Sequence, residues 1–292
     1  MTQPSVNLLL ASDLHVDVGA YPLRDRINKV LDTGAQIDAV VLAGDLCESD
    51  YLGGPVAYAQ REVPSHLPVA FVPGNHDFYK GRYGTLVNQW LAQAKGSHVQ
   101  VLVEEEMVVA NPYREEIVLL GTPLWSNLAS MGPLVESDLR RGVHRQISDF
   151  AVMLGSQGEA WNVQQMLAQF EKGQLFLERG LSRAALADGR RRVVVTHFGP
   201  HRESIAPRWR GVDISAYFIN HLPELVERAD LWIHGHTHEA CEYQVGEDPE
   251  RGLVVCHPRG YLVGTESKQA LAYEPMLIEV PVNRIPWDRG IA

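Results

Sequence analysis

Short apolar runs alternate with longer amphipathic stretches along most of the chain. Runs rich in β-branched residues predict strands at residues 6–11, 38–43, 69–72, 99–102, 107–110, 117–120, 193–196 and 231–234. The run Asp-Ala-Val-Val-Leu-Ala at 38–43 is apolar after its first residue, which predicts a strand buried on both faces. Further short strands are predicted in the tail at 241–245, 253–256 and 276–280. The alternation predicts a layered α/β fold.

Helical stretches between the strands carry recognisable ends. Residues 22–33 predict a helix that begins with proline and ends before Gly34, because proline favours the first helical turn and glycine the position after the last. A second helix is predicted at 83–94. The stretch 213–228 also has a helical pattern, although Pro223 should break or kink it.

The sequence changes character between residues 127 and about 187. Strand signals vanish, and Gln, Ala, Leu, Glu and Met dominate, as in 164–170 and 174–186. We interpret this segment as a helical insertion, which either caps one end of the sheet or only packs along its flank. Because no repeat or low-complexity linker interrupts the chain, we predict one domain over residues 1–292.

The composition is that of a globular protein, and it argues against some classes of binding partner. Of 292 residues, 45% are hydrophobic and 21% charged, and the net charge of -10 argues against binding long tracts of nucleic acid. Three cysteines without framework spacing argue against a disulfide-stapled secreted fold. Residues 6–11 lack the features of a signal peptide, and no apolar run approaches the length of a membrane span, about 20 residues. We therefore predict a cytoplasmic protein without a membrane partner.

Polar clusters stand directly after five of the predicted strands. They are Asp13-Leu14-His15, Gly44-Asp45, Gly74-Asn75-His76-Asp77, Thr196-His197 and Gly235-His236-Thr237-His238. Ligands of open α/β sheets bind outside the carboxyl ends of the strands, so we expect these side chains to converge. The glycines in three of the clusters would let the chain turn sharply as it leaves the strand.

The side chains in these clusters are donors that suit metal ions. Carboxylate oxygen, imidazole nitrogen and amide oxygen bind Mn, Fe or Zn, and no thiolate belongs to the set. Seven candidate ligands are too many for one metal and fit two metals that share a carboxylate. They are Asp13, His15, Asp45, Asn75, His197, His236 and His238. His234 should point to the opposite face of its strand, and we expect a structural role for it.

In this order, DLH, GD, GNHD, H and GHTH resemble the motifs DxH, GD, GNH(D/E), H and GHxH of the calcineurin-like metallophosphoesterase superfamily. The resemblance implies a four-layer α/β/β/α sandwich with metals at the strand ends, here carrying the helical insertion. The residues that it assigns to one metal are Asp13, His15 and His238. Those that it assigns to the other are Asn75, His197 and His236, with Asp45 bridging both.

The same resemblance implies a metal-dependent phosphoesterase, a hydrolase in which a hydroxide bridging two metal ions attacks phosphorus. His76 would stabilise the transition state or protonate the leaving oxygen, and Asp77 would orient and charge its ring. The substrate would be a phosphomonoester or phosphodiester, and we favour a small or nucleotide-like one. The chain lacks the Asp-Arg-Gly that follows the second motif in phosphoprotein phosphatases, which disfavours that branch.

Two alternatives share the motifs. A nuclease acting on single-stranded nucleic acid would need a positive groove, and the net charge of -10 counts against it. A non-catalytic scaffold would have lost ligands or the catalytic histidine, whereas all seven ligands and His76 are retained.

Three further segments are candidates for substrate contact. His257-Pro258-Arg259-Gly260-Tyr261 resembles the NPRGY-like loop of family members, and Arg259 either contacts the phosphate or has a structural role. Gly121-Thr122-Pro123-Leu124-Trp125-Ser126 resembles another family segment, in which Trp125 either lines the pocket or anchors the insertion. The third segment could meet a second phosphate or form a solvated loop, and its candidates are His201, Arg202 and Arg208.

Overall fold

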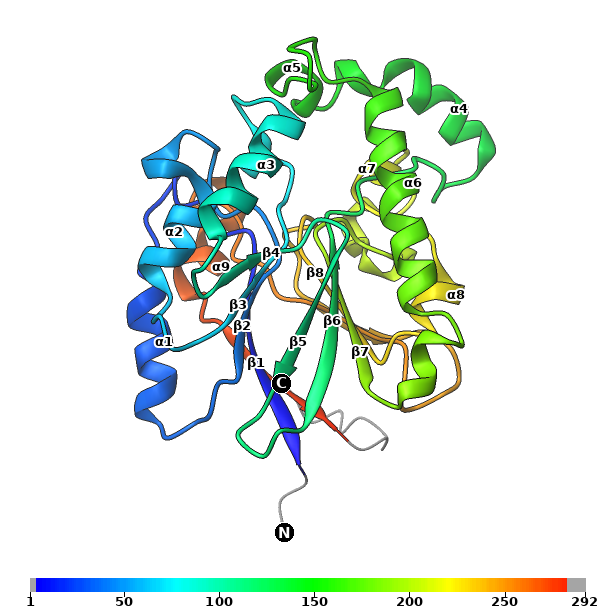
Figure 1. Cartoon of the computed structure of the whole chain (residues 1–292). Coiled ribbons are helices and arrows are strands. Elements are labelled where there is room, and N and C mark those ends of the chain that lie inside the picture. The colour runs from blue at the N-terminus through cyan, green and yellow to red at the C-terminus, as the bar shows by residue number, and fades with distance from the viewer. Residues whose placement is uncertain (1–3, 283–292) are drawn as a thin grey trace.

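The computed structural model describes residues 4–282, which form two β-sheets covered by helices (Figure 1). The sheets pack face to face, and helices lie outside each of them. This arrangement confirms the predicted α/β sandwich with four layers. None of the helices within residues 4–282 is both long and apolar enough to cross a membrane.

The first sheet has five strands in the order β11-β1-β2-β3-β4. Their bounds are Ser5–Ala11 for β1, Ala39–Leu42 for β2, Val69–Phe71 for β3, Val99–Val101 for β4 and Met276–Pro281 for β11. The strands β1 to β4 run parallel, and β11 pairs antiparallel with β1. The four parallel strands therefore end at the same edge of the sheet.

The second sheet has six strands in the order β5-β6-β7-β8-β10-β9. Their bounds are Glu105–Ala110 for β5, Glu116–Thr122 for β6, Arg191–Thr196 for β7, Leu231–His234 for β8, Cys241–Gln244 for β9 and Leu253–Cys256 for β10. The inner strands β6, β7, β8 and β10 run parallel, and antiparallel strands close both edges. Every strand that the sequence predicts is present.

An apolar inter-sheet layer separates the two sheets. Side chains alternate along a strand, so Leu8 and Leu10 point into this layer while Leu9 belongs to the cluster beneath the helices. The same alternation buries both faces of β2, as predicted. The inter-sheet layer is formed chiefly by Val6, Leu8, Leu10, Val41, Ala70 and Ile278 from the first sheet, and by Val109, Ile117, Leu119, Val193, Val195, Leu231, Ile233, Leu253 and Val255 from the second.

Helices cover the outer faces of the sandwich. On the side of the first sheet lie α1 (Leu23–Asp32), α2 (Gly54–Glu62), α3 (Tyr83–Ala94) and α9 (Ser267–Ala272), and on the side of the second lie α6 (Val163–Gly180) and α8 (Pro223–Val226) (Figure 1). The helices predicted at 22–33 and 83–94 are confirmed. The predicted break is also present, because Pro223 begins α8 and a separate helix, α7, ends earlier (Ser215–Phe218).

The segment between residues 127 and 187 is helical, as predicted. It comprises α4 (Pro133–Gly142), α5 (Asp149–Val152) and α6. The helix α6 runs through most of its second half, and Asn162 and Gln165 begin it with a reciprocal capping box. Gly180 lets α6 approach the second sheet, since a Cβ there would lie 2.8 Å from a methyl carbon of Leu120. In Figure 1, α4 and α5 lie beyond the end of the sandwich where the parallel strands finish.

Candidate metal centre

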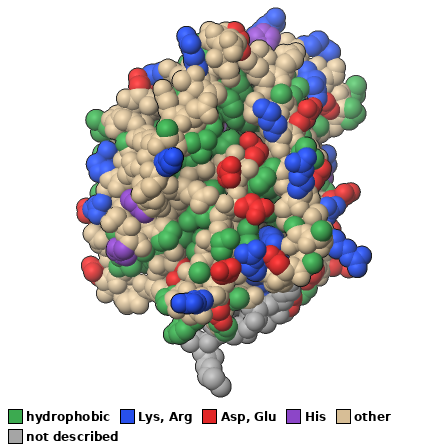
Figure 2. All heavy atoms as spheres, viewed as in Figure 1, with side chains coloured by type: hydrophobic (Ala, Val, Ile, Leu, Met, Phe, Trp, Pro, Cys, Tyr) green, Lys and Arg blue, Asp and Glu red, His purple; other side chains and the backbone are tan. Residues whose placement is uncertain are grey.

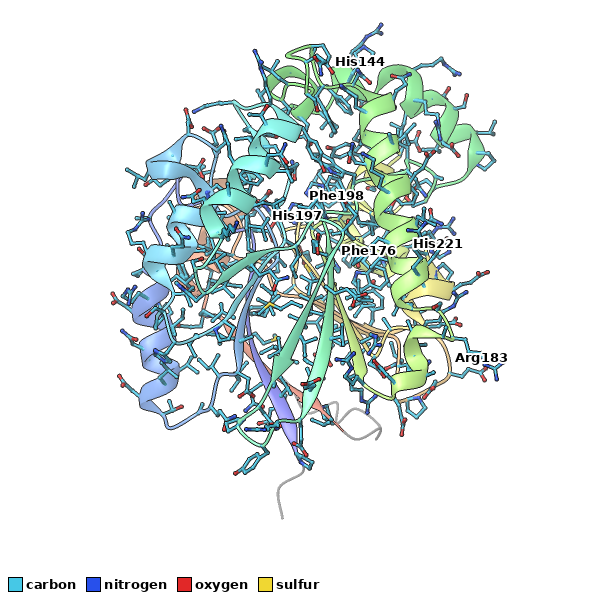
Figure 3. All side chains as sticks on the ribbon, in the orientation of Figure 1. His144, Phe176, Arg183, His197, Phe198 and His221 are labelled. Atoms are coloured by element: carbon cyan, nitrogen blue, oxygen red, sulfur yellow. The ribbon has the colours of Figure 1, made fainter. Side chains whose placement is uncertain are left out.

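The carboxyl ends of the parallel strands bring the predicted ligands to one edge of the sandwich. The first sheet supplies Asp13 and His15 after β1, Asp45 after β2 and Asn75 after β3. The second supplies His197 after β7, and His236 and His238 after β8. Figure 3 shows His197 at the upper ends of the strands. The cluster therefore needs both sheets.

Four of these side chains form the first donor group. One ligand atom from each of Asp13, His15, Asp45 and His238 lies within 4.8 Å of all the others. Nε2 of His15 is 3.0 Å from Nε2 of His238 and 3.8 Å from Oδ2 of Asp45. Nε2 of His238 is 3.4 Å from Oδ1 of Asp13. Oxygen and nitrogen donors at these spacings suit a single cation.

The second donor group shares Asp45 with the first. Ligand atoms of Asp45, His197 and His236 lie within 4.8 Å of one another. Nε2 of His197 is 3.3 Å from Oδ2 of Asp45 and 3.1 Å from Oδ1 of Asn75, which brings the amide oxygen to this group. One carboxylate, that of Asp45, thus belongs to both groups.

Hydrogen bonds on the far side of two rings fix which nitrogen faces the cluster. Nδ1 of His197 lies 3.0 Å from the carbonyl oxygen of Ala43, which can only accept, so this nitrogen donates. Nδ1 of His238 lies 2.8 Å from a carboxylate oxygen of Glu266. Burial alone would lower the pKa of both rings, but Asp45 raises that of His197 to about 9, and Asp13 with Glu266 raises that of His238 to about 10. A bound metal ion would displace the proton on Nε2, and that nitrogen would then direct its lone pair into the cluster, the usual arrangement for histidines that bind metal.

Besides Nδ1 of His15, two buried atoms in the cluster have no hydrogen-bond partner. They are Oδ2 of Asp13 and Nε2 of His236, and each residue belongs to one of the donor groups. Buried polar atoms are normally paired, because an unpaired one costs about 1–3 kcal/mol. The two atoms indicate ligands that the protein itself does not supply, and the residues present fit a pair of metal ions.

The electrostatics of the cluster favour cations. Burial lowers the pKa of His15 and of His236 well below the ordinary value, so both rings are neutral, the form that binds metal. Burial would raise the pKa of Asp45, but His197 and the other histidines around it hold that pKa well below its usual range. The shared carboxylate is therefore charged at neutral pH.

Several ligands adopt backbone conformations that side-chain-bearing residues seldom use. Their φ angles are 52° for Asp13, 42° for His15, 54° for Asp45, 68° for His236 and 51° for His238. This left-handed region costs on the order of 1–3 kcal/mol for each residue and persists only where the surrounding structure enforces it. The strands and their packing therefore hold the donors in place.

The glycines of the motifs serve two different purposes. Gly44 has a φ of 89° and provides the predicted turn after β2. Gly74 and Gly235 do not have positive φ and are required for space instead. A Cβ at Gly74 would lie 2.1 Å from Oδ1 of Asp45, and one at Gly235 would lie 2.5 Å from Oδ2 of Asp13.

The predicted pairing of Asp77 with the ring of His76 is wrong. Both carboxylate oxygens of Asp77 are used by backbone N–H groups at 2.8–3.2 Å, which belong to Gly74, Asp45, Leu46 and Cys47. Burial raises the pKa of Asp77 to about 8, and the Asp45 carboxylate adds to the rise. Asp77 ties the loop after β2 to the loop after β3.

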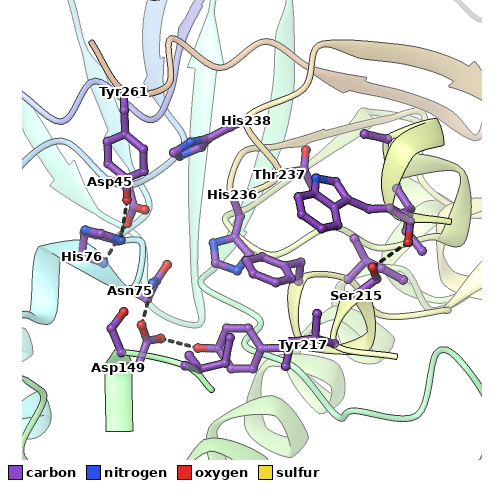
Figure 4. Close-up of a pocket in the computed structure, with 18 of the residues that line it drawn as sticks. Asp45, Asn75, His76, Asp149, Ser215, Tyr217, His236, Thr237, His238 and Tyr261 are labelled. Atoms are coloured by element: carbon purple, nitrogen blue, oxygen red, sulfur yellow. Dashed lines mark hydrogen bonds between the residues drawn. The ribbon is translucent and has the colours of Figure 1, made fainter. Parts of the chain in front are cut away.

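The ring of His76 is held by two tyrosines. Its Nε2 lies 3.0 Å from the hydroxyl of Tyr261, and the ring stacks on Tyr79 with 4.2 Å between the centroids. The backbone N–H of His76 donates to Oδ1 of Asp45, so the residue borders the cluster without joining either donor group. Figure 4 shows the ring beside the shared aspartate, with the hydrogen bond to Tyr261 drawn as a dashed line.

A cavity of about 520 Å³ opens over the cluster. Its lining includes Asp45, Asn75, His76, His236 and His238 (Figure 4). The insertion contributes residues 146–149 to one wall. Another wall comes from the segment between β7 and β8 and is largely apolar, with Ile205, Trp209, Ile214, Phe218 and Ile219.

Of the two alternatives left open for Arg259 and Trp125, substrate contact or a structural role, the surroundings of both side chains favour the structural role. Arg259 is 2% exposed, and its guanidinium donates to the carbonyl oxygens of Leu14, Gly19 and Ala20. Trp125 is 1% exposed and packs in an aromatic cluster formed by Phe78, Tyr83, Trp161 and Phe198. Neither residue lines the cavity, and Trp125 anchors the insertion through Trp161.

The three candidates that follow His197 are separated by the fold. Arg208 lines the cavity and pairs with Glu239 at 2.8 Å. Arg202 donates to the carbonyl oxygen of Ser130, and the ring of His201 packs 4.7 Å from that of His221. Only Arg208 of the three therefore borders the space over the cluster.

Sequence reasoning missed three residues that support the cluster. Asp149, from α5, accepts a hydrogen bond of 3.0 Å from Nδ2 of Asn75, which turns the amide oxygen toward His197. It also accepts from the hydroxyls of Tyr79 and Tyr217. The other two are Glu266, which accepts from His238 and the Tyr261 backbone, and Tyr261 itself. Tyr261 ends a segment that the sequence did single out, whereas Asp149 and Glu266 carry no motif signal.

Comparisons with known proteins agree with this geometry. A family model described as calcineurin-like phosphoesterase matches residues 6–240. None of the curated proteins with which the sequence was compared matches it. Among solved structures, phosphopantetheinyl hydrolase from Mycobacterium tuberculosis aligns with a TM-score of 0.62 at 13% identity, over 96% of this chain and 97% of that one.

Two other solved structures align less closely. A dimetal phosphatase from Danio rerio gives a TM-score of 0.49 at 15% identity over 87% of each chain. The NAD nucleotidase of Haemophilus influenzae gives 0.49 at 12% identity, over 88% of this chain and 46% of that one. Sequence identities this low show only that the fold is shared. The family model matches residues 6–240 and therefore carries the family assignment. The chain belongs to the calcineurin-like phosphoesterase family.

Proposed function

We propose that this protein hydrolyses a phosphate ester of a small organic molecule with the help of two metal ions. One observation carries the proposal: Asp45 belongs to both donor groups, and members of both groups line a single cavity. These are Asp45, Asn75, His236 and His238. A carboxylate shared in this way is typical of paired cations that act on one substrate.

The donor groups define which residues would hold each ion. The first group is Asp13, His15, Asp45 and His238, and the second is Asp45, Asn75, His197 and His236. Nitrogen and oxygen donors without thiolate suit Mn, Fe or Zn. Bound metal ions would supply a water of lowered pKa as the nucleophile and positive charge for the phosphate oxygens.

The location of His76 supports its role as the acid that protonates the leaving oxygen. The ring is half-buried at the cavity wall, outside both donor groups. The Tyr261 hydroxyl and the face of Tyr79 fix its orientation. A positioned group of this kind contributes typically 100- to 10,000-fold to the rate.

The cavity favours an ester whose organic part is apolar or aromatic. Opposite the donor groups, Trp209, Phe218 and Ile214 offer a surface that excludes water from such a group. Arg208 at the margin could contact a further anionic group of the substrate. The volume of about 520 Å³ suits a small or nucleotide-like ester, either a monoester or a diester.

The charge of the protein surface also favours a small substrate over a nucleic acid. The net charge is -10, and on the face drawn in Figure 2 acidic and basic side chains are interspersed. A strand of nucleic acid would instead require a continuous basic groove. We further propose that the insertion caps the cavity as part of the same domain, since residues 146–149 line it.

A paired assay tests the proposal. The monoester and the diester of one aryl chromophore are offered to the protein loaded with Mn, Fe or Zn, beside the His76→Ala variant. We expect turnover of at least one ester, and a loss of about 100-fold or more in His76→Ala with unchanged metal content. The matched control is His144→Ala, because His144 is exposed in the insertion, well away from the strand ends (Figure 3).

Three outcomes would count against the proposal. Metal-loaded protein that turns over neither ester would favour a scaffold. Cleavage of single-stranded DNA with manganese, without hydrolysis of the small esters, would favour a nuclease. Full turnover by metal-loaded His76→Ala would show that His76 is not the acid that protonates the leaving oxygen.

A further inference from the structure

A second cluster of potential ligands lies in the second sheet, outside both donor groups. It consists of His234 at the end of β8, Cys256 at the end of β10 and Cys241 at the start of β9. One ligand atom from each lies within 4.8 Å of the others. The mechanism proposed above uses none of these side chains.

The pairing of the strands explains why the three residues meet. Cys256 is the register partner of His234 across β10 and β8, and Cys241 is its partner across β10 and β9. Residues paired in this way project from the same face of a sheet, about 5 Å apart. The three side chains therefore form one row across three adjacent strands.

The hydrogen bonds of His234 place a lone pair on one ring nitrogen, which now accepts from a hydroxyl that an ion would displace. Nδ1 lies 2.8 Å from the carbonyl oxygen of Gly235, which can only accept, so Nδ1 carries the proton. Nε2 therefore has a lone pair, and it lies 2.8 Å from Oγ of Ser204. A histidine whose far nitrogen donates to a backbone carbonyl has the orientation found in metal-binding histidines.

The cluster is buried but can be reached from the surface. His234 is 0% and Cys256 1% exposed, whereas Cys241 is partly exposed. A cavity of about 400 Å³ is lined by Ser204, Cys241 and Tyr243. An ion could enter from this cavity. Once bound, it would contact solvent only on the side that faces the cavity.

We propose that His234, Cys241 and Cys256 bind a zinc ion, with the fourth position facing Ser204 and the cavity. Two thiolates and one imidazole are a known ligand set for zinc, whereas manganese and magnesium prefer oxygen. Zinc–sulfur bonds of about 2.3 Å and zinc–nitrogen bonds of about 2.0–2.1 Å place tetrahedral ligand atoms roughly 3.5–3.8 Å apart. These separations lie within the limit of 4.8 Å that the three ligand atoms satisfy.

Binding releases one proton from each thiol to solvent, so the affinity rises with pH. A disulfide is the competing state of the two cysteines, but it would not involve His234. The row of three donors is what favours the metal.

The ion would act on the loop that carries His236 and His238. Sγ of Cys256 lies 3.7 Å from the carbonyl oxygen of Gly235 and 3.6 Å from the hydroxyl of Thr237. A zinc ion joining β8, β9 and β10 at this point would fix the base of the loop. Its role would be structural, and it would not require the proposed esterase activity.

Cobalt provides a direct probe of this site in the full-length protein. Reduced protein is loaded with Co²⁺, and absorption from thiolate-to-cobalt charge transfer is recorded. No sulfur belongs to the two donor groups, so the band reports only ligation by cysteine. We expect it in the wild-type protein and in Cys47→Ser, the matched control, and we expect its loss in Cys241→Ser and Cys256→Ser.

Zinc should displace the cobalt band, because zinc binds such sites more tightly. Elemental analysis should find one equivalent less zinc in Cys241→Ser than in Cys47→Ser, with zinc affinity reduced at least about tenfold. Since Cys241 is partly exposed, this variant should keep its fold by circular dichroism. The inference is overturned if reduced wild-type protein gives no band, if the band survives in both cysteine variants, or if Cys47→Ser abolishes it.

Discussion

The hydroxyl of Tyr261 lies 3.0 Å from Nε2 of His76 and joins the tail of the chain to the wall of the cavity. Glu266 accepts a hydrogen bond from the backbone of Tyr261 and another from Nδ1 of His238. One carboxylate thus sets the position of a ligand and of the residue that orients the proposed acid. The chain between β10 and β11 is therefore part of the site, although its ligands come from other loops.

Tyr261→Phe should lower turnover by about 5- to 10-fold while metal content stays the same. The change removes one hydrogen bond, worth about 1 kcal/mol, from the ring that we propose as the acid. The pH profile of kcat should also shift, which a purely structural role would not cause. Tyr113→Phe is the matched control, since Tyr113 is 82% exposed. An unchanged rate and profile would show that the hydrogen bond does not matter for the reaction.

Asp45→Ala should empty both metal positions, because each donor group loses the carboxylate that they share. His236→Ala should empty only one of them, since His236 belongs to the second group alone. Metal per chain, measured by elemental analysis after dialysis, separates the two results. Equal losses in the two variants would argue that the groups do not bind independent ions.

Asp149→Ala should destabilise the protein and weaken metal binding together. The carboxylate accepts from Nδ2 of Asn75 and from the hydroxyls of Tyr79 and Tyr217, so its removal leaves buried donors unpaired. Each such donor costs about 1–3 kcal/mol. Urea unfolding and metal titration report the two effects, with the exposed Asp213→Ala as control. Metal affinity equal to that of the control would mean that the insertion does not support the cluster.

Gly74→Ala should displace Asp45 and reduce metal affinity by at least about tenfold, the scale of changes next to a ligand. The added Cβ would lie 2.1 Å from Oδ1 of Asp45, so one of the two groups would have to move. Gly142→Ala is the matched control, because a Cβ there meets nothing within 4 Å. If metal affinity and thermal unfolding matched those of this control, the loop after β3 would be able to accommodate the methyl group without displacing Asp45.

The residues that the sequence could locate are those whose position depends on the strand before them. Asp13, Asp45 and His197 each follow a run of apolar residues, and parallel strands necessarily deliver such positions to one edge. The four-layer fold followed from the same runs. The helix α2 escaped prediction because it begins with Gly54 and Pro55, which together read as a turn.

Contacts between distant segments could not be predicted in the same way. Nothing near Asp77 indicates that four backbone N–H groups use its carboxylate, since these groups come from two loops about 30 residues apart. The guanidinium of Arg259 likewise meets carbonyl groups about 240 residues away. Asp149 reaches Asn75 only because α5 lies over the strand ends. Local sequence carries residue chemistry, whereas these partners are set by tertiary packing.

The apolar layer between the sheets has a consequence for reactivity. Both donor groups draw side chains from the two sheets, so the separation of the sheets sets the spacing across each group. The layer keeps the two sheets at a fixed separation. A bulkier side chain at a position such as Ala70 would push the sheets apart and widen the spacing between ligands that come from different sheets. The apolar interior of the sandwich therefore sets the geometry that the two donor groups would offer to metal ions.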